Sequence, residues 1–401
     1  MRLSLLGSTG SIGRGTLQVV REIETPVTVV ALAAGRDVDA LVRQALEFRP
    51  ELISVADAHA LGRLRSALSG ISGYAPRCVC GPDGILAAAV DVDFDVLVSA
   101  AVGVVGLDAT YRAVKAGCRV ALANKEVLVA GGEPVMAAAR SSGADLLPVD
   151  SEHNAVHQCL RAGREDEVER VILTASGGPF RTIPREDLAA VTPERALRHP
   201  TWKMGRRITI DSATMMNKGF EVIEACRLFD LQPEAVEVVV HPQSIVHAMV
   251  EYRDGSLIAQ LSPPDMKLPI RYALAYPARE ASPRERMDWT RVPELNFEPP
   301  DLAKFPLLAL AYEALRVGGL AGCLLNAADE VAVEAFLGGR IPFLGIAEIV
   351  EATLARNSSR DPSSIAGVLE CDREARAYAL DLANRMANTR AVHSHAAAGK
   401  R

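Results

Sequence analysis

Short apolar runs alternate with amphipathic segments over the first 150 residues of the chain. The apolar runs predict strands at Leu3–Leu6, Val27–Ala33, Leu52–Val55, Val96–Ser99, Val120–Leu122 and Leu146–Val149. Helical spacing separates them, as at Leu17–Glu24, Val38–Phe48 and Val127–Arg140. Because strand–helix alternation at this spacing is typical of parallel sheets, we expect an α/β domain over residues 1–149 with a doubly wound parallel sheet.

The rest of the chain has a different pattern. Val246–Arg253 and Ser256–Leu261 flank Asp254-Gly255, which predicts an antiparallel hairpin within a central mixed α/β domain over residues 150–276. Six prolines between Pro277 and Pro306 predict a surface linker over residues 277–306. Helical spacing then predicts a C-terminal helical domain over residues 307–390, and the small polar residues 391–401 predict a disordered tail.

Composition narrows the class of protein. The 401 residues are 49% hydrophobic and 23% charged, which excludes disorder over most of the length. A net charge of −6 argues against a nucleic-acid partner. We find no apolar run long enough to cross a bilayer and no signal peptide, and the seven scattered cysteines suit reduced thiols. These features predict a soluble, cytoplasmic protein with no membrane partner.

A glycine-rich loop follows the first predicted strand. Gly7-Ser8-Thr9-Gly10-Ser11-Ile12-Gly13 leads into a helix, whose free N–H groups and positive potential attract phosphate. The spacing differs from the dinucleotide pattern G-x-G-x-x-G, and the alternative is a tight turn without a ligand. The place of the loop after the first strand of a βαβ unit favours nucleotide binding and a Rossmann-like fold.

The end of the second predicted strand indicates which nicotinamide cofactor binds. A site for NAD usually offers an acidic residue there, whereas this chain has Ala34-Gly35-Arg36. A guanidinium can hold a 2′-phosphate through two hydrogen bonds, which favours NADPH. The alternative is that Arg36 only solvates a loop, and the neighbouring Asp37 and Asp39 weigh against the assignment.

Two acidic segments suggest a metal site. Asp150 and Glu152 follow the Leu146–Val149 strand and can share one hard cation, Mg²⁺ or Mn²⁺; the alternative is that they cap a helix. In the segment 212–221, Glu221 can be a third ligand, while Asn217 and Lys218 reach substrate oxygens. The alternative is an ordinary ion pair between Lys218 and Glu221, one turn apart on a solvated helix.

Three further features point to substrate binding. Ser212, Asn217 and Lys218 together suit a phosphate group, and Ser176-Gly177-Gly178-Pro179 can form a small anion-binding turn. The segment 199–208, with Trp202 and Met204, is either a mobile flap that excludes water or an ordinary surface loop.

Several longer segments together resemble the 1-deoxy-D-xylulose 5-phosphate reductoisomerase family over nearly the whole chain. The segments, in order, are Gly7–Gly13, Ala123–Glu126, Val149–Ala155, Ser176–Phe180, His199–Met204, Asp211–Glu221, His241–Ser244 and Leu325–Ala328. The resemblance implies an oxidoreductase of isoprenoid precursor biosynthesis that uses NADPH and Mg²⁺ or Mn²⁺. It further implies isomerisation of 1-deoxy-D-xylulose 5-phosphate, reduction to 2-C-methyl-D-erythritol 4-phosphate, and a homodimer.

The resemblance also implies roles for matched residues. Cofactor contacts fall on Thr9, Gly10, Ser11, Ile12, Gly35, Arg36, Asp37, Asn124, Glu126 and Gly205. Metal ligands fall on Asp150, Glu152 and Glu221, and the flap carries Trp202 and Met204. Substrate contacts fall on Lys125, Ser151, Glu152, Ser176, His199, Ser212, Asn217, Lys218 and Glu221. Lys125 and Glu152 are the candidates for catalytic proton transfer.

Two residues depart from the family pattern, and two other functions compete. Asp37 and Asp329 stand where the family more often has asparagine; the first puts one adenosine contact in question, and we expect the second to matter little. A simple NADP-dependent dehydrogenase would need no three-carboxylate metal site. A nucleotide-sensing regulator would tolerate loss of Lys125, Glu152 or Glu221.

Overall fold

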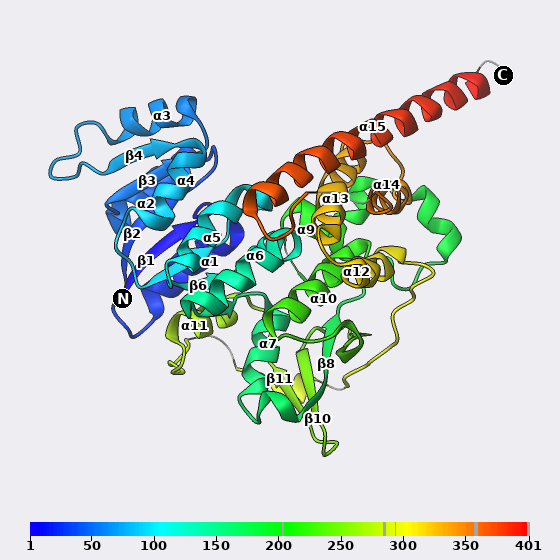
Figure 1. Cartoon of the computed structure of the whole chain (residues 1–401), viewed down its shortest axis with the longest axis horizontal. Helices are drawn as coiled ribbons and strands as arrows, with labels where there is room; N and C mark the ends of the chain where they lie inside the picture. The colour runs from blue at the N-terminus through cyan, green and yellow to red at the C-terminus, as the bar shows by residue number, and fades with distance from the viewer. Residues whose placement is uncertain (203, 284–285, 293, 357–359, 399–401) are drawn as a thin grey trace. The chain divides into compact units, whose positions relative to one another are not determined.

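The computed structural model describes residues 1–202, 204–283, 286–292, 294–356 and 360–398, with side chains up to residue 389. The chain divides into two compact units. One unit comprises residues 1–128, 132–166 and 258–288, and the other comprises residues 129–131, 167–257 and 289–401. Figure 1 gives the element labels used below.

The first unit contains a seven-stranded sheet in the order β4-β3-β2-β1-β5-β6-β7. Its strands are β1 (Arg2–Leu6), β2 (Thr28–Ala33), β3 (Leu52–Val55), β4 (Arg77–Cys80), β5 (Val96–Ser99), β6 (Arg119–Leu122) and β7 (Leu146–Pro148). Every pair of neighbouring strands is parallel, which confirms the doubly wound sheet. The order reverses between β1 and β5, and such switch points bind ligands at the carboxyl ends of the strands.

Helices alternate with these strands, as the hydrophobic pattern predicts. They are α1 (Ser11–Glu22), α2 (Val38–Phe48), α3 (Ala58–Leu68), α4 (Gly81–Val90), α5 (Leu107–Lys115), α6 (Glu126–Ser142), α7 (Ser151–Leu160) and α11 (Lys267–Ala275). Leu3, Leu5, Leu32 and Ile53 are fully buried in the core of this unit. Each such side chain contributes roughly 1.5–3 kcal/mol of burial free energy, so the apolar runs determine where the strands lie.

Strand β4 is absent from our sequence prediction. It is an edge strand that pairs only with β3, and Arg77-Cys78-Val79-Cys80 is nowhere fully buried. A short, partly exposed strand carries too weak an apolar signal to be recognised. All seven cysteines, including Cys78 and Cys80, are thiols outside any disulfide.

The second sheet has four strands in the order β11-β10-β8-β9. They are β8 (Val168–Ala175), β9 (Val236–Val240), β10 (Val246–Tyr252) and β11 (Leu257–Leu261). Strand β10 pairs antiparallel with β8, and β9 pairs parallel with β8. The predicted turn at Asp254-Gly255 is present, because the N–H of Tyr252 donates to Ser256 O at 2.9 Å and Gly255 has a φ of +84°.

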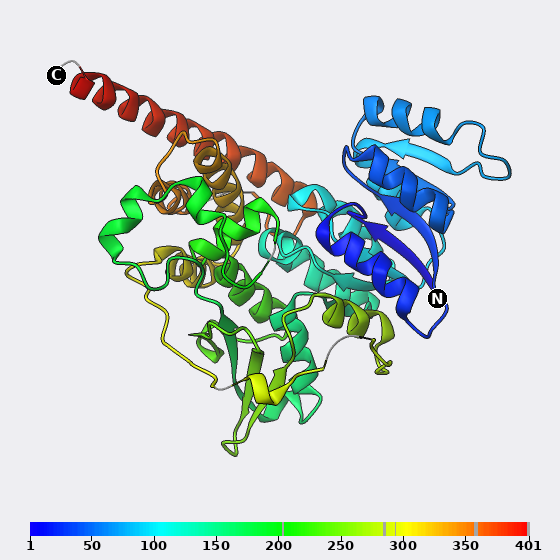
Figure 2. The same ribbon diagram turned by 180° about the vertical axis from the view of Figure 1, so that it is seen from behind.

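Helices make up most of the second unit. They are α8 (Pro193–Ala196), α9 (Arg206–Ala213), α10 (Met216–Leu228), α12 (Pro306–Val317), α13 (Ala321–Leu337), α14 (Gly345–Leu354) and α15 (Ile365–Ala398). Helix α13 packs against α9, α12, α14 and α15, and helix α10 packs against α9 and α12. In Figures 1 and 2, α15 extends well past α14 towards the C-terminus.

The observed units differ from the predicted domain boundaries in two respects. Helices α7 and α11, which we assigned to the central domain, pack together and against the large sheet, because Ile270, Ala273 and Leu274 of α11 join its core. Helix α15 continues through residues 391–398, where we expected a disordered tail; the alanines of this segment favour a helix. Residues 399–401 lie outside the described part of the chain.

Most of the described residues of the proline-rich segment lie outside regular helices and strands. It forms one short 3₁₀ turn at Trp289–Arg291, and its Glu298 pairs with Val240 of β9. Among the described residues, no helix is both long enough and apolar enough to cross a membrane.

Candidate active site

The glycine-rich loop joins β1 to α1 in a conformation that glycine permits. The N–H groups of Gly7 and Ser8 both donate to Ala33 O, at 2.8 and 2.9 Å. Gly7 has a φ of +85°, and a Cβ on Gly13 would lie 2.3 Å from Gly7 O. Helix α1 begins after Gly10, and glycine has no side chain that could cap a helix. The first N–H groups of α1 are therefore available to an anion.

One residue that supports this loop was missed by the sequence analysis. Gln44 of α2 donates from Nε2 to Ser8 O at 2.9 Å, and its side chain is buried. A polar residue on the buried face of an amphipathic helix was the available signal, because such a group needs a hydrogen-bond partner.

Arg36 and Asp37 lie beyond β2, as predicted. The Arg36 side chain is 83% exposed and its Nε donates to Asp57 at 2.8 Å, so the guanidinium can reach a ligand. A backbone hydrogen bond from Ala60 and the Arg36 guanidinium lower the pKa of Asp57. The Asp37 carboxylate accepts a hydrogen bond from the N–H of Ala40 at 3.1 Å and so caps the N-terminus of α2. This aspartate, which departs from the family pattern, therefore stabilises the helix.

Asn124 and Glu126 support the loop that follows β5. Asn124 Nδ2 donates to Ala101 O and to Gly103 O, the latter at 2.9 Å, and Glu126 accepts from the Gly103 N–H at 3.3 Å. Both side chains are therefore tied to the switch-point edge of the sheet, where a nucleotide would bind.

Lys125 and Asp150 form a nearly buried ion pair. Lys125 Nζ donates to Asp150 Oδ2, and the side chains are 11% and 10% exposed. His153 Nδ1 lies 3.3 Å from the other Asp150 oxygen. Burial opposes ionisation of Asp150, but Lys125 and His153 outweigh it and hold its pKa well below the usual range. Asp150 is therefore a carboxylate, as a metal ligand must be.

Ser151, Glu152 and His157 complete this part of the chain. Ser151 Oγ donates to Glu152 Oε2 at 2.5 Å, and the backbone N–H of Glu152 donates to Asp150 Oδ1 at 3.3 Å. His157 Nδ1 forms a hydrogen bond with the Tyr272 hydroxyl at 2.8 Å, so His153 and His157 do not point to a shared zinc ion.

In the second unit, His199 joins two predicted substrate residues. Its Nε2 lies 3.0 Å from Ser176 Oγ and 3.1 Å from Ser212 Oγ. Its Nδ1 accepts the N–H groups of Thr201 and Trp202 at 3.1 and 2.9 Å. Burial lowers the pKa of His199, so the neutral ring carries its proton on Nε2 and donates towards the serines.

The turn after β8 holds Ser176 close to Ser212. Gly177 and Gly178 have φ values of +79° and +66°, and a Cβ on Gly178 would lie 2.6 Å from Ser212 O. The Ser176 hydroxyl also accepts the N–H of Gly178 at 3.3 Å. Two residues 36 positions apart in the sequence are thus brought together by a backbone that only glycine allows.

Helix α10 carries the remaining predicted polar residues on one face. Asn217 Nδ2 and Lys218 Nζ both donate to the Glu221 carboxylate. The Lys218 and Glu221 side chains are 4% and 1% exposed, so the solvated surface ion pair that we considered is excluded. Removing a lysine and a carboxylate from water costs free energy that their ion pair does not fully repay. A pair kept at that cost favours a role in ligand binding over one in stability.

The segment 199–208, which we predicted to be a flap, comprises the loop before α9 and the first three residues of that helix. The centroids of the Trp202 and His247 rings are 6.4 Å apart, and Met204 is partly exposed. Gly205 precedes α9, where its carbonyl accepts both the N–H and the hydroxyl of Thr209. Lys203 lies outside the described residues.

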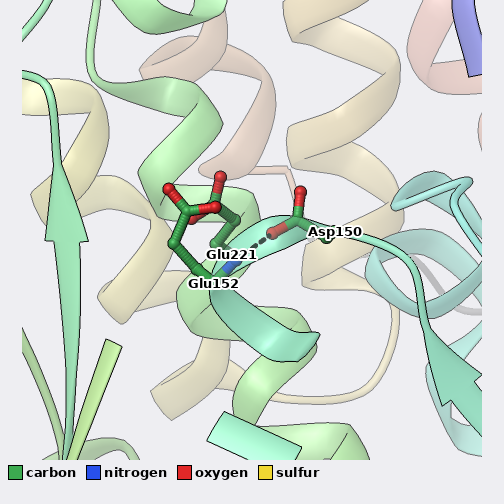
Figure 3. A group of neighbouring side chains, drawn as sticks. All are labelled: Asp150, Glu152 and Glu221. Atoms are coloured by element: carbon green, nitrogen blue, oxygen red, sulfur yellow. Dashed lines mark hydrogen bonds between the residues drawn. The ribbon is translucent and has the colours of Figure 1, made fainter. Parts of the chain in front are cut away.

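Asp150, Glu152 and Glu221 together form a group that could hold a cation. One carboxylate oxygen from each lies within 4.8 Å of the others. Figure 3 shows the three side chains. Three oxygen donors of this kind suit Mg²⁺ or Mn²⁺ rather than zinc. Two members of this group, Asp150 and Glu221, each form an ion pair with a lysine.

Comparison with known proteins gives one family throughout. Family models described as 1-deoxy-D-xylulose 5-phosphate reductoisomerase match residues 3–132, and two of its C-terminal domain models match residues 146–229 and 261–378. The chain is 57% identical to the 1-deoxy-D-xylulose 5-phosphate reductoisomerase of Solibacter usitatus over 95% of this chain and 97% of that protein. It is 50% identical to the Chlorobium phaeovibrioides enzyme over 93% and 97%.

Solved structures agree with the sequence comparison. The Zymomonas mobilis reductoisomerase in complex with NADPH superposes with a TM-score of 0.88 at 45% identity, over 95% of this chain and 98% of that one. A reductoisomerase in complex with NADPH, fosmidomycin and magnesium gives a TM-score of 0.91 at 40% identity, over 96% and 98%. With relatives at 50–57% identity over 93–95% of its length, this chain belongs to the 1-deoxy-D-xylulose 5-phosphate reductoisomerase family.

Proposed function

We propose that this chain isomerises 1-deoxy-D-xylulose 5-phosphate and reduces the product with NADPH, using a divalent metal held by Asp150, Glu152 and Glu221. The observation that carries the proposal is the group of three carboxylates, each with one oxygen within 4.8 Å of the others. A simple dehydrogenase has no need of such a group.

Bound Mg²⁺ or Mn²⁺ would supply a Lewis acid to the ketone and neighbouring hydroxyl oxygens, and NADPH would supply hydride. Lys125, which contacts Asp150, would donate a hydrogen bond to a substrate oxygen. Glu152 and Lys125 are our candidates for moving protons at the reacting carbons. Ser151 would add a hydroxyl contact to the substrate.

Ser176, His199, Ser212, Asn217 and Lys218 would bind the substrate through its phosphate and hydroxyl groups. Neutral His199 donates from Nε2, and the serine hydroxyls supply further donors around it. Lys218 donates to Glu221 and would also supply a positive charge to the substrate phosphate. Binding energy from the phosphate would favour closure of the 199–208 flap, with Trp202 and Met204 excluding water.

The loop from Thr9 to Ile12 would bind the NADPH pyrophosphate at the start of α1. Gly35, Arg36 and Asp37 would lie at the adenosine end, where Arg36 can pair with the 2′-phosphate. Asn124, Glu126 and Gly205 would also contact the cofactor. Of these, Asn124 and Glu126 already fix the loop after β5.

We further propose that the chain works as a cytoplasmic homodimer. Strand β11 is at the edge of its sheet, and its Leu257 and Ile258 side chains are 49% and 37% exposed. An exposed apolar edge strand is a ready surface for pairing with a second copy. Light scattering of the wild type and of L257K would test this, and a monomeric wild type would contradict it.

The test of the reaction follows NADPH absorbance after addition of 1-deoxy-D-xylulose 5-phosphate and magnesium, with and without excess chelator. Oxidation only when metal is available is expected. Glu221→Gln should abolish turnover and leave NADPH affinity unchanged, because it removes one metal ligand. Glu224→Gln, a buried carboxyl on the same helix outside the group of three, is the matched control and should retain turnover. Full turnover by E221Q would remove Glu221 from the metal site.

A further inference from the structure

A second buried charged cluster joins three helices of the second unit. It consists of Arg207 and Asp211 on α9, Asn326, Asp329 and Glu330 on α13, and Asp372 and Arg376 on α15. Arg207 pairs with Glu330 at 3.0 Å and donates to Asn326 Oδ1 at 3.2 Å. None of these residues belongs to the three-carboxylate group. The sequence analysis noted Asp329 only as a departure from the family pattern and assigned no catalytic or binding role to the cluster.

The cluster contains more acids than bases. Four carboxyl groups face two guanidinium groups, and the side chains of Asp211, Asp329, Glu330 and Asp372 are only 6%, 0%, 17% and 6% exposed. Full ionisation of these six described groups would leave two negative charges in excess among largely buried side chains. Since a buried charge without compensation is costly, protonation of one of these carboxyl groups would stabilise the cluster.

Asp329 is the carboxyl group with the weakest compensation. Neither of its oxygens accepts a hydrogen bond from a described residue, and its nearest cation, Arg207 Nη2, is 3.7 Å away. Arg207 makes its shorter contact with Glu330 instead. Burial and the facing Asp211 carboxylate raise the pKa of Asp329 well above its ordinary value. Burial also raises the pKa of Asp372, but Arg376 lies only 2.7 Å from that group.

Charged and titratable groups also lie on each helix that packs against α13. From α9, Arg207 and Asp211 act on Asp329, and from α13 itself Glu330 does. On α15, Arg376 is shared between Glu330 and Asp372. On α12, Glu313 pairs with Arg316 near the surface, and the Tyr312 hydroxyl donates to Val236 O. On α14, Glu348 and Glu351 are exposed.

We propose that Asp329 keeps its proton at neutral pH and donates it in a hydrogen bond to Asp211, so that it acts as a positioning residue for the substrate site. Asp211 directly precedes Ser212, whose hydroxyl contacts His199 at 3.1 Å. Arg207, held by the same cluster, is the second residue of α9 and lies within the 199–208 flap segment. This inference rests on the proposed substrate role of Ser212 and His199.

The proposal predicts a specific dependence on pH. As the pH rises through the raised pKa, Asp329 loses its proton, the hydrogen bond is lost and two carboxylates repel each other across α9 and α13. Ser212 and His199 then lose their alignment, so the KM for the phosphorylated substrate rises. The KM for NADPH should rise much less, because the proposed pyrophosphate loop lies between β1 and α1 and only Gly205 of the proposed cofactor contacts adjoins α9.

The test compares Asp329→Asn and Asp329→Ala with the wild-type enzyme, with both KM values measured over the neutral and alkaline range. Asparagine has a permanent N–H donor of the same size, so D329N should keep a low substrate KM with no alkaline rise. D329A lacks the donor and should have a raised substrate KM at every pH. In the wild type, the substrate KM should rise by up to about tenfold per pH unit above the pKa of Asp329, as the loss of one proton requires. An equal alkaline rise in D329N and wild type would overturn the proposal.

An infrared difference spectrum of wild type minus D329N at neutral pH gives a readout that does not depend on turnover. A carbonyl band of a protonated carboxyl group in that difference is expected, and its absence would overturn the proposal. Ser212→Ala separates this result from the site assignment. If S212A leaves the substrate KM unchanged, the proposed role of Ser212 fails, whereas the infrared band reports on Asp329 alone.

Discussion

Replacing Gly178 with alanine should weaken substrate binding without weakening NADPH binding. Gly178 has a φ of +66°, and its Cβ would lie 2.6 Å from Ser212 O, where ordinary contact needs 3.4 Å. The two backbones must therefore separate by about 0.8 Å, the difference of those two distances. The hydrogen bond between Ser212 and His199 is already 3.1 Å long, so a shift of this size would break it.

The size of the effect follows from what is lost. A hydrogen bond to a charged group is worth about 1.5–3 kcal/mol, so losing the alignment of Ser212 with a phosphate should raise the substrate KM by roughly 10- to 100-fold. The left-handed conformation should cost a further ~1–2 kcal/mol of unfolding free energy. Steady-state kinetics with each substrate varied, together with urea unfolding, measure the two effects separately.

Gly255→Ala is the matched control. Gly255 has a φ of +84°, but no atom lies within 4 Å of its added Cβ. It should lose a similar ~1–2 kcal/mol of stability and keep normal KM values. If G178A and G255A had the same substrate KM, the turn after β8 would not position Ser212, and the argument would be refuted.

Three other predictions concern separate parts of the site. Burial lowers the pKa of His199, so its neutral form should persist as the pH falls below 6.5. Substrate binding should therefore fail only in more acid solution. A nuclear magnetic resonance titration of the ring that gave a pKa above 6.5 would contradict this. Gly13→Ala should weaken NADPH binding measured by fluorescence titration, since its Cβ would meet Gly7 O at 2.3 Å, and unchanged affinity would exclude this loop as the pyrophosphate site. Arg36→Gln should weaken NADPH binding by about 1.5–3 kcal/mol and leave NADH binding unaltered, whereas equal losses would show that Arg36 does not contact the 2′-phosphate.

Much of the fold could be predicted from local pattern. The buried strands and most helices have long apolar runs or helical spacing, and the glycine loop and Asp254-Gly255 turn are recognisable from a few residues. Strand β4 was missed because it is short and at an edge. The placement of α11 with the first unit could not be predicted either, since nothing in Lys267–Ala275 says which distant core receives its apolar face.

The sequence by itself determined the chemical inventory: the three acidic positions, the glycine loop, and the serine, histidine and lysine residues of the substrate site. Their contacts depended on the tertiary structure. His199 becomes a neutral donor only because distant Ser176, Ser212 and two backbone N–H groups surround it.

Asp329 is the clearest case of the difference. From sequence it was an unusual aspartate of little expected consequence, on a helix 118 positions after Asp211. Folding buries it completely and turns it towards that carboxyl group. Burial and the approach of a like charge depend on which segments pack together, and no local pattern contains that information.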